Sequence, residues 1–338
     1  SYSVTGVQTC ALPIFWHLCG VTLNQIHYRL QMSGKELITL ALLPACLTLI
    51  SCGNTPDKST HTPPARKTNA VGYDLSNPDR ILDLPPALFE ISGIAVIDST
   101  SVACVQDENG IVFVYDLVEN EIRDHFTFHY PGDYEGIARV DDTFYILRSD
   151  GTVFETRTQQ SPDLTRQIPL AGAASAEYEG LCYDRRNHRL LIVPKSKTGK
   201  EYGDRKKHPL FGLNLVSDNP EWEKVLDFDL KAITRYAADN NIKVPDGKDE
   251  IRLRVSDIAI HPLTGMLFGI SAANLMLCVF NDDGTVHYIE KLDSELFNLP
   301  EGISFLDNGD MLISNEGGNN SPTILLFSYE NIENRVRK

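Results

Sequence analysis

Three short stretches of the chain are nearly the same: DYEGIA at residues 133–138, EYEGLC at 177–182 and LPEGIS at 299–304. Two weaker copies, ISGIAV at 91–96 and VSDIAI at 255–260, extend the set. The repeated position is separated by 43, 44, 78 and 44 residues and is filled by Ser92, Glu135, Glu179, Asp257 and Glu301. A period near 44 residues is typical of a four-stranded β-propeller blade.

The residues between the repeats form short β-rich runs separated by turn residues. The 78-residue interval is explained by two insertions, at 196–208 and 231–252, and KAITRYAADNN in the second has a helical pattern. The last unit has only three runs, so we expect DRILDLPP at 79–86 to supply its fourth strand and close the ring. The sequence thus predicts an all-β fold, a five-bladed propeller of four-stranded antiparallel blades at 73–330, with six blades as the alternative.

The amino-acid composition limits the kinds of molecule that this protein is expected to bind. The formal net charge of −15 argues against nucleic acid, because neutralising phosphates needs clustered Lys and Arg. A cation or a basic surface is the more natural partner. Cys104, Cys182 and Cys278 each stand in an apolar run and are expected to be buried, and no CxxC or His-rich spacing indicates zinc. We expect a monomer.

The first 72 residues read as a leader and a tether. Residues 1–31 resemble a translated sequencing adapter and contain no Met, so we exclude them as an artefact, and residues 331–338 form a charged tail. Residues 32–51 are typical of a signal peptide, and LISC at 49–52 resembles a lipobox, which implies lipidation of Cys52. A plain secretory signal or a membrane-anchoring helix is the alternative. The polar residues 52–72 then form a flexible tether at the bacterial cell envelope.

Several longer stretches together resemble the SdiA-regulated family of bacterial exported proteins, which are relatives of the NHL-repeat propellers. They are ACVQDENGIVFVYDL, YILRSDGTVFE, RLLIVPK, SDIAIHPLTGMLFGIS and PEGISFLDNGDMLISNEGG, in addition to the repeats. The resemblance covers most of the predicted propeller. It implies a five-bladed fold with a bound calcium ion and no settled biochemical activity.

The repeated acids stand where each inner strand begins, so five blades bring them close to one axis. Two like charges about 4 Å apart cost on the order of 4 kcal/mol at an effective dielectric constant of about 20. Either some carboxyls are protonated or a cation lies among them, and oxygen donors suit calcium. The expected metal ligands are Glu135, Glu179, Asp257, Glu301, Asp107 and Asn315. The alternative is that each acid accepts hydrogen bonds from the amides of its own turn.

Further polar residues are expected at the same rim as ligand-binding candidates, namely Gln106, Glu108, Arg148, Lys195 and Glu316. The two basic residues either form ordinary salt bridges or hold an anion beside the metal. The predicted function is a calcium-binding, membrane-anchored propeller that binds an anionic small molecule or a protein partner. The alternative is a calcium-dependent, phytase-like hydrolase of phosphate or other esters. No nucleophile–His–acid constellation stands out, so no catalytic residue is assigned.

Overall fold

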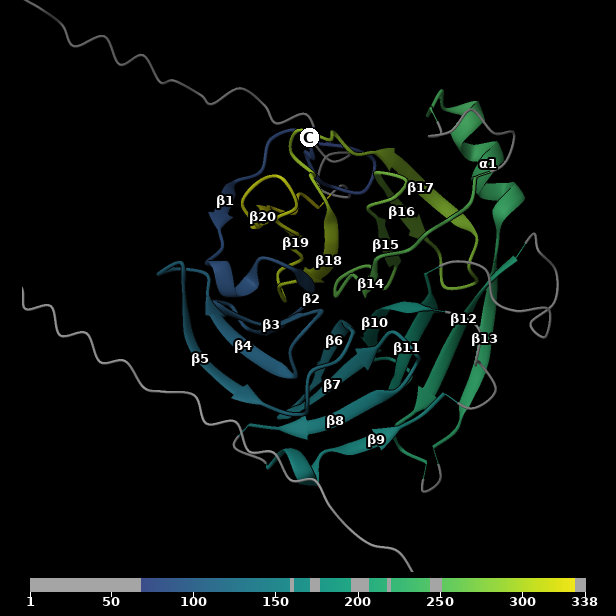
Figure 1. The fold of residues 1–338 in the computed structure, drawn as a ribbon. Coiled ribbons are helices and arrows are strands. Elements are labelled where there is room, and N and C mark those ends of the chain that lie inside the picture. The colour runs from purple at the N-terminus through teal and green to yellow at the C-terminus, as the bar shows by residue number, and fades with distance from the viewer. Residues whose placement is uncertain are drawn as a thin grey trace, which may run out of the picture. The chain divides into compact units, whose positions relative to one another are not determined.

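The repeated units fold into five four-stranded antiparallel sheets, which are the blades of a five-bladed β-propeller (Figure 1). This computed structural model describes residues 68–158, 161–170, 177–195, 207–217, 220–243 and 251–331. The chain divides into two units, Ser1–Thr62 and Pro63–Lys338, and every described residue lies in the second. The predicted leader, Cys52, most of the tether and residues 332–338 lie outside the described residues. Among the described helices, none has the length and hydropathy to cross a membrane.

Each blade takes its strands in sequence order from the centre outward, except the last. The first blade contains β2 (Ile91–Asp98), β3 (Ser101–Gln106), β4 (Ile111–Asp116) and β5 (Glu121–Thr127), and the second contains β6 (Tyr134–Val140), β7 (Thr143–Arg148), β8 (Val153–Arg157) and β9 (Arg166–Ile168). The third blade contains β10 (Tyr178–Asp184), β11 (Arg189–Pro194), β12 (Lys207–Asn214) and β13 (Trp222–Asp229), and the fourth contains β14 (Asp257–Ile260), β15 (Leu267–Ser271), β16 (Met276–Phe280) and β17 (Val286–Lys291). The fifth blade contains β18 (Pro300–Phe305), β19 (Met311–Asn315), β20 (Thr323–Phe327) and, as its outer strand, β1 (Arg80–Asp83).

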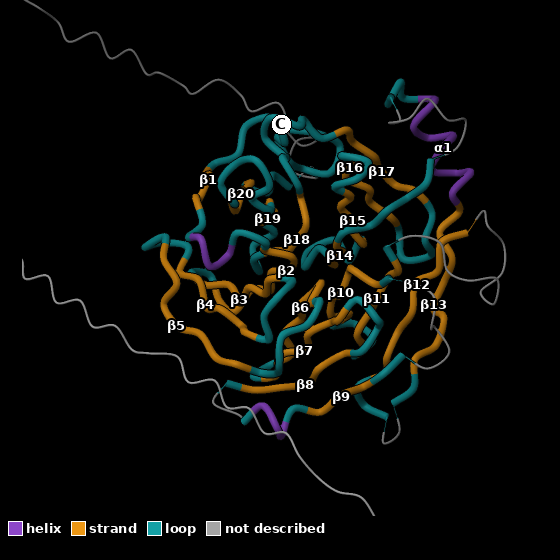
Figure 2. The backbone as a smooth tube through the Cα atoms, viewed as in Figure 1, coloured by secondary structure: helices purple, strands orange, loops and turns teal. Residues whose placement is uncertain are grey.

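The ring is closed by the strand that the sequence predicted. β1 pairs antiparallel with β20, with Ile81 opposite Leu325, so the first strand of the chain completes the last blade. The segment before β1 also packs on the propeller, where Val71 and Tyr73 are buried and the Tyr73 hydroxyl donates to the carbonyl of Gly309 at 2.6 Å. The inner strands β2, β6, β10, β14 and β18 contact one another in a cycle around the centre (Figures 1 and 2).

Burial follows position in the blade. The second strand β3 is buried along its whole length, because neighbouring blades cover both of its faces, whereas the outer strand β5 is mostly exposed. The short helix η1 (Pro86–Leu88) lies between the outer strand β1 and the inner strand β2, and η2 (Pro162–Leu164) lies between β8 and β9. The predicted helical insertion is confirmed as α1 (Leu230–Asp239), whose first amides bond the side chain of Asp229.

One boundary differs from the sequence prediction. Residues 207–208 were expected in a polar loop, but both belong to β12. His208 is buried there because its Nε2 bonds the carbonyl of Pro194 at 2.8 Å, and burial lowers the pKa of this imidazole to about 4. His208, which looks like part of a polar run in the sequence, is therefore a buried core residue that lies beside Pro194 at the end of β11.

Candidate functional site

The repeated glutamates are the extra residues of β-bulges. In the second blade Tyr134 pairs with Arg148 and Gly136 with Leu147, so Glu135 has no partner of its own. Glu179 and Glu301 occupy the same place in their blades, and Ser92 occupies it in the first. A bulge changes the direction of a side chain relative to the regular strand alternation. The four bulges thus turn Ser92, Glu135, Glu179 and Glu301 to equivalent positions at the start of the inner strands.

The following glycine allows neighbouring inner strands to approach closely. A Cβ atom on Gly136 would lie 2.9 Å from the carbonyl oxygen of Glu179 and 3.3 Å from the amide nitrogen of Leu181, both in the next blade. Gly93, Gly180 and Gly302 face the next inner strand in the same way. These glycines are therefore required by packing between blades.

Asp257 stands in the glycine position and differs from the glutamates. Its strand has no bulge, because Asp257 pairs directly with Ile270. One carboxylate oxygen accepts from the amide of Ile303 at 2.9 Å and the other from the amide of Leu181 at 3.2 Å. Burial raises the pKa of Asp257 well above its usual range, and these amides oppose the shift. Asp257 thus joins the fourth blade to the third and fifth through amides of those neighbouring blades, whereas the alternative from the sequence expected amides of its own turn.

The three bulge glutamates form one electrostatic group. Burial, followed by the charge of Glu179, raises the pKa of Glu135 to about 9. Burial raises the pKa of Glu179 to about 8, against the effect of Lys195 and with a contribution from Glu301. Burial also raises the pKa of Glu301 to about 7, although the hydroxyl of Ser256 donates to this carboxylate. The charge of Glu179 thus acts on Glu135 and that of Glu301 on Glu179, and ligation of an ion by these three residues stays a prediction.

Acids from the neighbouring turns extend this group. Burial raises the pKa of Asp107 to about 6, and the charges of Glu90, Glu316, Glu108 and Asp133 add to the effect. The pKa of Glu316 is also raised, by burial and by Glu90. We call the whole set the acidic rim; it consists of Glu90, Asp107, Glu108, Asp133, Glu135, Glu179, Glu301 and Glu316.

Lys195 provides positive charge inside the acidic rim. Its ammonium contacts the carboxylate of Glu179, which is 5% exposed, while the Lys195 side chain is 41% exposed. Partial burial lowers the pKa of Lys195, but its hydrogen bond to Glu179 and the charges of Glu179, Glu135 and Glu301 outweigh burial and raise it. The ordinary salt-bridge interpretation of this residue agrees with the geometry.

The remaining predicted residues have other partners. Gln106 caps the turn after β3, since its Oε1 accepts from the amide of Asn109 at 2.7 Å. The Nδ2 of Asn315 donates to the carbonyl of Leu296 and to Thr323, although its buried Oδ1 has no partner. Arg148 forms a two-fold pair with Asp150 at 2.7 and 3.2 Å and lies over the ring of Phe154, so its charge is engaged within its own blade.

The acidic rim fits calcium in the chemistry of its donors, which are carboxylate and hydroxyl oxygens. It does not fit in its present spacing: across the described ranges, no three His, Cys, Asp or Glu side chains are gathered closely enough to hold a metal ion. The ammonium of Lys195 already contacts Glu179, one of the carboxylates that would attract such an ion. Calcium ligation by Glu135, Glu179, Asp257, Glu301, Asp107 and Asn315 stays a prediction, and Asp257 has both oxygens engaged by amides.

Sequence reasoning missed three members of this site. Glu90 and Asp133 act on Asp107, and Asp133 was visible as the first letter of DYEGIA. Ser256 fills the glutamate position of the fourth blade, since it precedes Asp257 and its hydroxyl reaches Glu301. The sequence did predict the shift of the acid by one position, because Ile258 follows Asp257 directly where the other units have a glycine, but it assigned Ser256 no role.

Comparison with known proteins supports the fold. Glutaminyl cyclase from Myxococcus xanthus has a similar structure, with a TM-score of 0.52 and 13% identity, over 75% of this chain and 96% of that one. Streptogramin B lyase (TM-score 0.42, 11% identity, 74% and 97% coverage) and the WD40 propeller domain of Doa1 (0.39, 12%, 75% and 97%) are also similar. Neither a protein-family model nor a curated protein sequence matches the chain.

At these identities the likeness concerns the fold alone. The chain is a β-propeller with an acidic rim around Lys195 at the start of its inner strands. The resemblance to the SdiA-regulated family stays a prediction.

Proposed function

We propose that this propeller is a binding module of the bacterial cell envelope whose acidic rim takes up a cation, with calcium as the expected ion. The observation that carries the proposal is the contact of the Lys195 ammonium with the carboxylate of Glu179, beside which the charges of Glu135 and Glu301 also raise the pKa of Lys195. Three partly desolvated carboxyls raise one another's pKa values, and a divalent ion among them would remove both the repulsion and the protons.

Calcium is preferred over other ions because the available donors are hard oxygens, without a nearby thiolate or imidazole at the rim. Binding requires the Lys195 ammonium to move aside and the carboxylates to draw together. The proposed ligands are Glu135, Glu179, Glu301 and Asp107; Asp107 has a buried Oδ1 atom that lacks a hydrogen-bond partner. Lys195 thus acts as a resident cation with which calcium competes.

The experiment compares the melting temperature of the purified propeller in calcium, in magnesium and in chelator. An ion that binds only the folded state stabilises it by about 2.7 kcal/mol at a hundred times its Kd. We expect calcium to raise the melting temperature and Glu135→Gln with Glu301→Gln to abolish the increase. An identical melting temperature in calcium and chelator would contradict the proposal.

A calcium-dependent hydrolase is the second candidate. The carboxyl of Glu301, with a pKa of about 7, exchanges protons near neutral pH and accepts a hydrogen bond from Ser256. The test is release of phosphate from phenyl phosphate in the presence of calcium. Turnover that persists in Glu301→Gln would exclude this residue from the mechanism, and absence of turnover would favour the binding module.

Anchoring at the envelope rests on the sequence LISC at 49–52. We propose that Cys52 carries the lipid. Palmitate labelling in a bacterial host provides the test, with Cys52→Ser expected to lose the label and Cys46→Ser, in the apolar run of the leader, expected to keep it. Labelling of the Cys52→Ser protein would contradict the assignment.

A further inference from the structure

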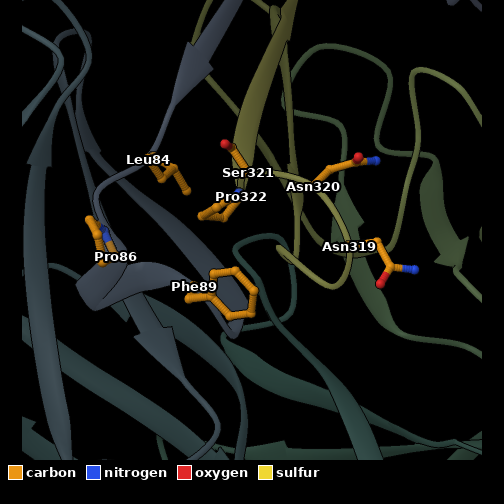
Figure 3. Close-up of a pocket in the computed structure, with 7 residues that line it drawn as sticks. All are labelled: Leu84, Pro86, Phe89, Asn319, Asn320, Ser321 and Pro322. Atoms are coloured by element: carbon orange, nitrogen blue, oxygen red, sulfur yellow. The ribbon is translucent and has the colours of Figure 1, made fainter.

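A pocket lies at Phe89, between η1 and the turn that joins β19 to β20 (Figure 3). Leu84 and Pro322 in its wall are buried, so it offers a ligand little apolar surface. Exposed charges without a partner are found instead on residues 251–255, which lead into the inner strand β14 of the fourth blade.

Residues 251–255 alternate between the core and the surface. Ile251, Leu253 and Val255 are buried, whereas Arg252 and Arg254 are exposed. This alternation is that of an extended chain, in which every second side chain points to the same side. The side chains of Arg252 and Arg254 therefore leave the segment on the same, solvent-facing side.

Both ends of this segment are held by hydrogen bonds. The amide of Ile251 donates to the hydroxyl of Thr234 in α1 at 3.0 Å, and the amide of Ser256 donates to the carbonyl of Ile270 in β15 at 2.8 Å. The hydroxyl of Ser256 reaches Glu301 of the acidic rim. The segment thus runs inward from α1 to the centre of the ring, and its two arginines lie between α1 and the acidic rim (Figure 1).

Asn274 joins this segment to a third cation. Its Oδ1 accepts from the amide of Arg254 at 3.1 Å, and its carbonyl accepts from the Nζ of Lys291 at 2.8 Å. Asn274 is buried, and the hydroxyl of Ser271 donates to the same Oδ1 at 3.0 Å, so both contacts rest on a well-fixed turn. We call Arg252, Arg254 and Lys291 the basic strip.

The surroundings of the basic strip are positive although the protein as a whole is acidic. The formal net charge is −15, but the described parts of this insertion, residues 230–243 and 251–256, contain one acid, Asp239, and five basic residues, which are Lys231, Arg235, Lys243, Arg252 and Arg254. No member of the basic strip forms an ion pair within the part of the chain that the structure describes. Its positive charge is therefore available to a ligand.

The basic residues that the sequence suggested for an anion do not have this property. Arg148 is paired with Asp150, and Lys195 contacts Glu179. In contrast, partial burial lowers the pKa of Lys291, and no nearby carboxylate among the described residues opposes this shift. The fourth blade thus provides the better anion site.

We propose that the basic strip binds a small soluble ligand that carries two phosphate groups. A guanidinium group can donate two parallel hydrogen bonds to one phosphate, and the two arginines start about 7 Å apart, since each extended residue spans about 3.3–3.6 Å. Each phosphate can therefore face one guanidinium group, with Lys291 beside Arg254. This inference goes beyond the proposed function, because binding at the basic strip does not need the calcium ion.

Calorimetric titration of the purified protein with fructose 1,6-bisphosphate tests the basic strip. The buffer contains no calcium and has a low ionic strength, at which exposed charges are little screened. We expect the bisphosphate to bind about tenfold more tightly than fructose 6-phosphate, because its second phosphate adds a charge-assisted contact. Equal affinity for the two sugars, or no binding of either, would overturn the proposal.

Protein variants test the location. Arg252→Gln and Arg254→Gln are each expected to reduce the affinity for the bisphosphate about tenfold, to that of the monophosphate, while the amide of residue 254 keeps its bond to Asn274. Arg185→Gln removes an exposed arginine from the turn between β10 and β11 and is the matched control. Wild-type affinity in both Arg252→Gln and Arg254→Gln would contradict the site. Because calcium is absent throughout, this inference and the proposed function can each fail without the other.

A lipid headgroup with two phosphates carries the same chemistry. The net charge of −15 opposes approach to an anionic bilayer, so a soluble ligand is favoured. Sedimentation with cardiolipin vesicles separates the two sources, and we expect the protein to stay in the supernatant. Sedimentation with the vesicles that is lost in Arg254→Gln would overturn the soluble ligand.

Discussion

The ammonium of Lys195 contacts the carboxylate of Glu179 across the first two strands of the third blade. Glu179 is the bulge residue that follows Tyr178, and Tyr178 pairs with Pro194, so the two charged side chains start from neighbouring positions. The contact is local, but its charge is felt by Glu135 and Glu301 in two other blades. Lys195 therefore acts on four members of the acidic rim, Glu135, Glu179, Glu301 and Glu316.

Replacing Lys195 with Met tests this role. Without the ammonium, the buried carboxylate of Glu179 loses its ion-pair partner, so we expect a loss of about 1 kcal/mol in the free energy of unfolding at pH 8, since Lys195 is partly exposed and screened. We also expect tighter calcium binding, because the competing cation is gone. Urea unfolding with and without calcium measures both effects. Lys224→Met, which removes a comparably exposed Lys paired with Asp227, is the control. Weaker calcium binding in Lys195→Met would contradict competition.

The raised pKa values predict how stability depends on alkaline pH. Glu135 keeps its proton in the folded state up to a pH of about 9, whereas the unfolded chain releases it near 4.5. Unfolding therefore releases a proton, and stability falls as pH rises from about 4.5 to about 9, by at most about 1.4 kcal/mol per pH unit. Urea unfolding between pH 7 and 9 should show a shallower decline in Glu135→Gln. An unchanged slope would argue against a protonated Glu135.

His261 predicts the opposite dependence at acid pH. Its Nδ1 accepts from the amides of Leu263 and Thr264, it lies among aromatic rings such as Tyr73, and burial lowers its pKa to about 4. The unfolded chain protonates near 6.5, so stability is lost as pH falls from about 6.5 to 4. His208 adds to this loss. In His261→Asn, an amide oxygen can accept the same two bonds, and we expect less loss between pH 6.5 and 5. A slope equal to wild type would contradict the prediction.

Asp257 is expected to be needed for stability. Removal of its carboxylate in Asp257→Ala leaves the buried amides of Leu181 and Ile303 without their acceptor, at a cost of about 1–3 kcal/mol for each amide. We expect a total loss of about 3 kcal/mol in the free energy of unfolding, with calcium binding retained. Asp239→Ala, at the exposed end of α1, is the control. Loss of calcium binding without loss of stability would instead indicate that Asp257 is a calcium ligand.

The architecture was predictable because blade repeats carry their own period. Three predictions were confirmed: the blades from the spacing of the Glu-Gly signal, the closing strand at 79–86 and the helical insertion. Each depends on a local sequence pattern or on the need to pair the edge of a sheet. The start of β12 was missed because Lys207 and His208 are polar residues. The hydrogen bond between His208 and the carbonyl of Pro194, which allows His208 to be buried, cannot be predicted from the sequence.

The site was predictable only in part. The convergence of Glu135, Glu179 and Glu301 follows from equivalent positions in a closed ring. The different role of Asp257 depends on a missing bulge, and that of Arg148 on a partner two residues away. The pocket at Phe89 joins two segments distant in sequence, η1 and the turn after β19, and carries no repeat signal.

The central claim is that a cation replaces protons and the ammonium of Lys195 at the acidic rim. Calorimetric titration of calcium at pH 7, in two buffers of different ionisation enthalpy, measures the ion and the released protons together. Because Glu135 has a pKa of about 9, we predict stoichiometric binding with release of a proton, and loss of this release in Glu135→Gln. Absence of binding, or binding with the same heat in both buffers, would contradict the account.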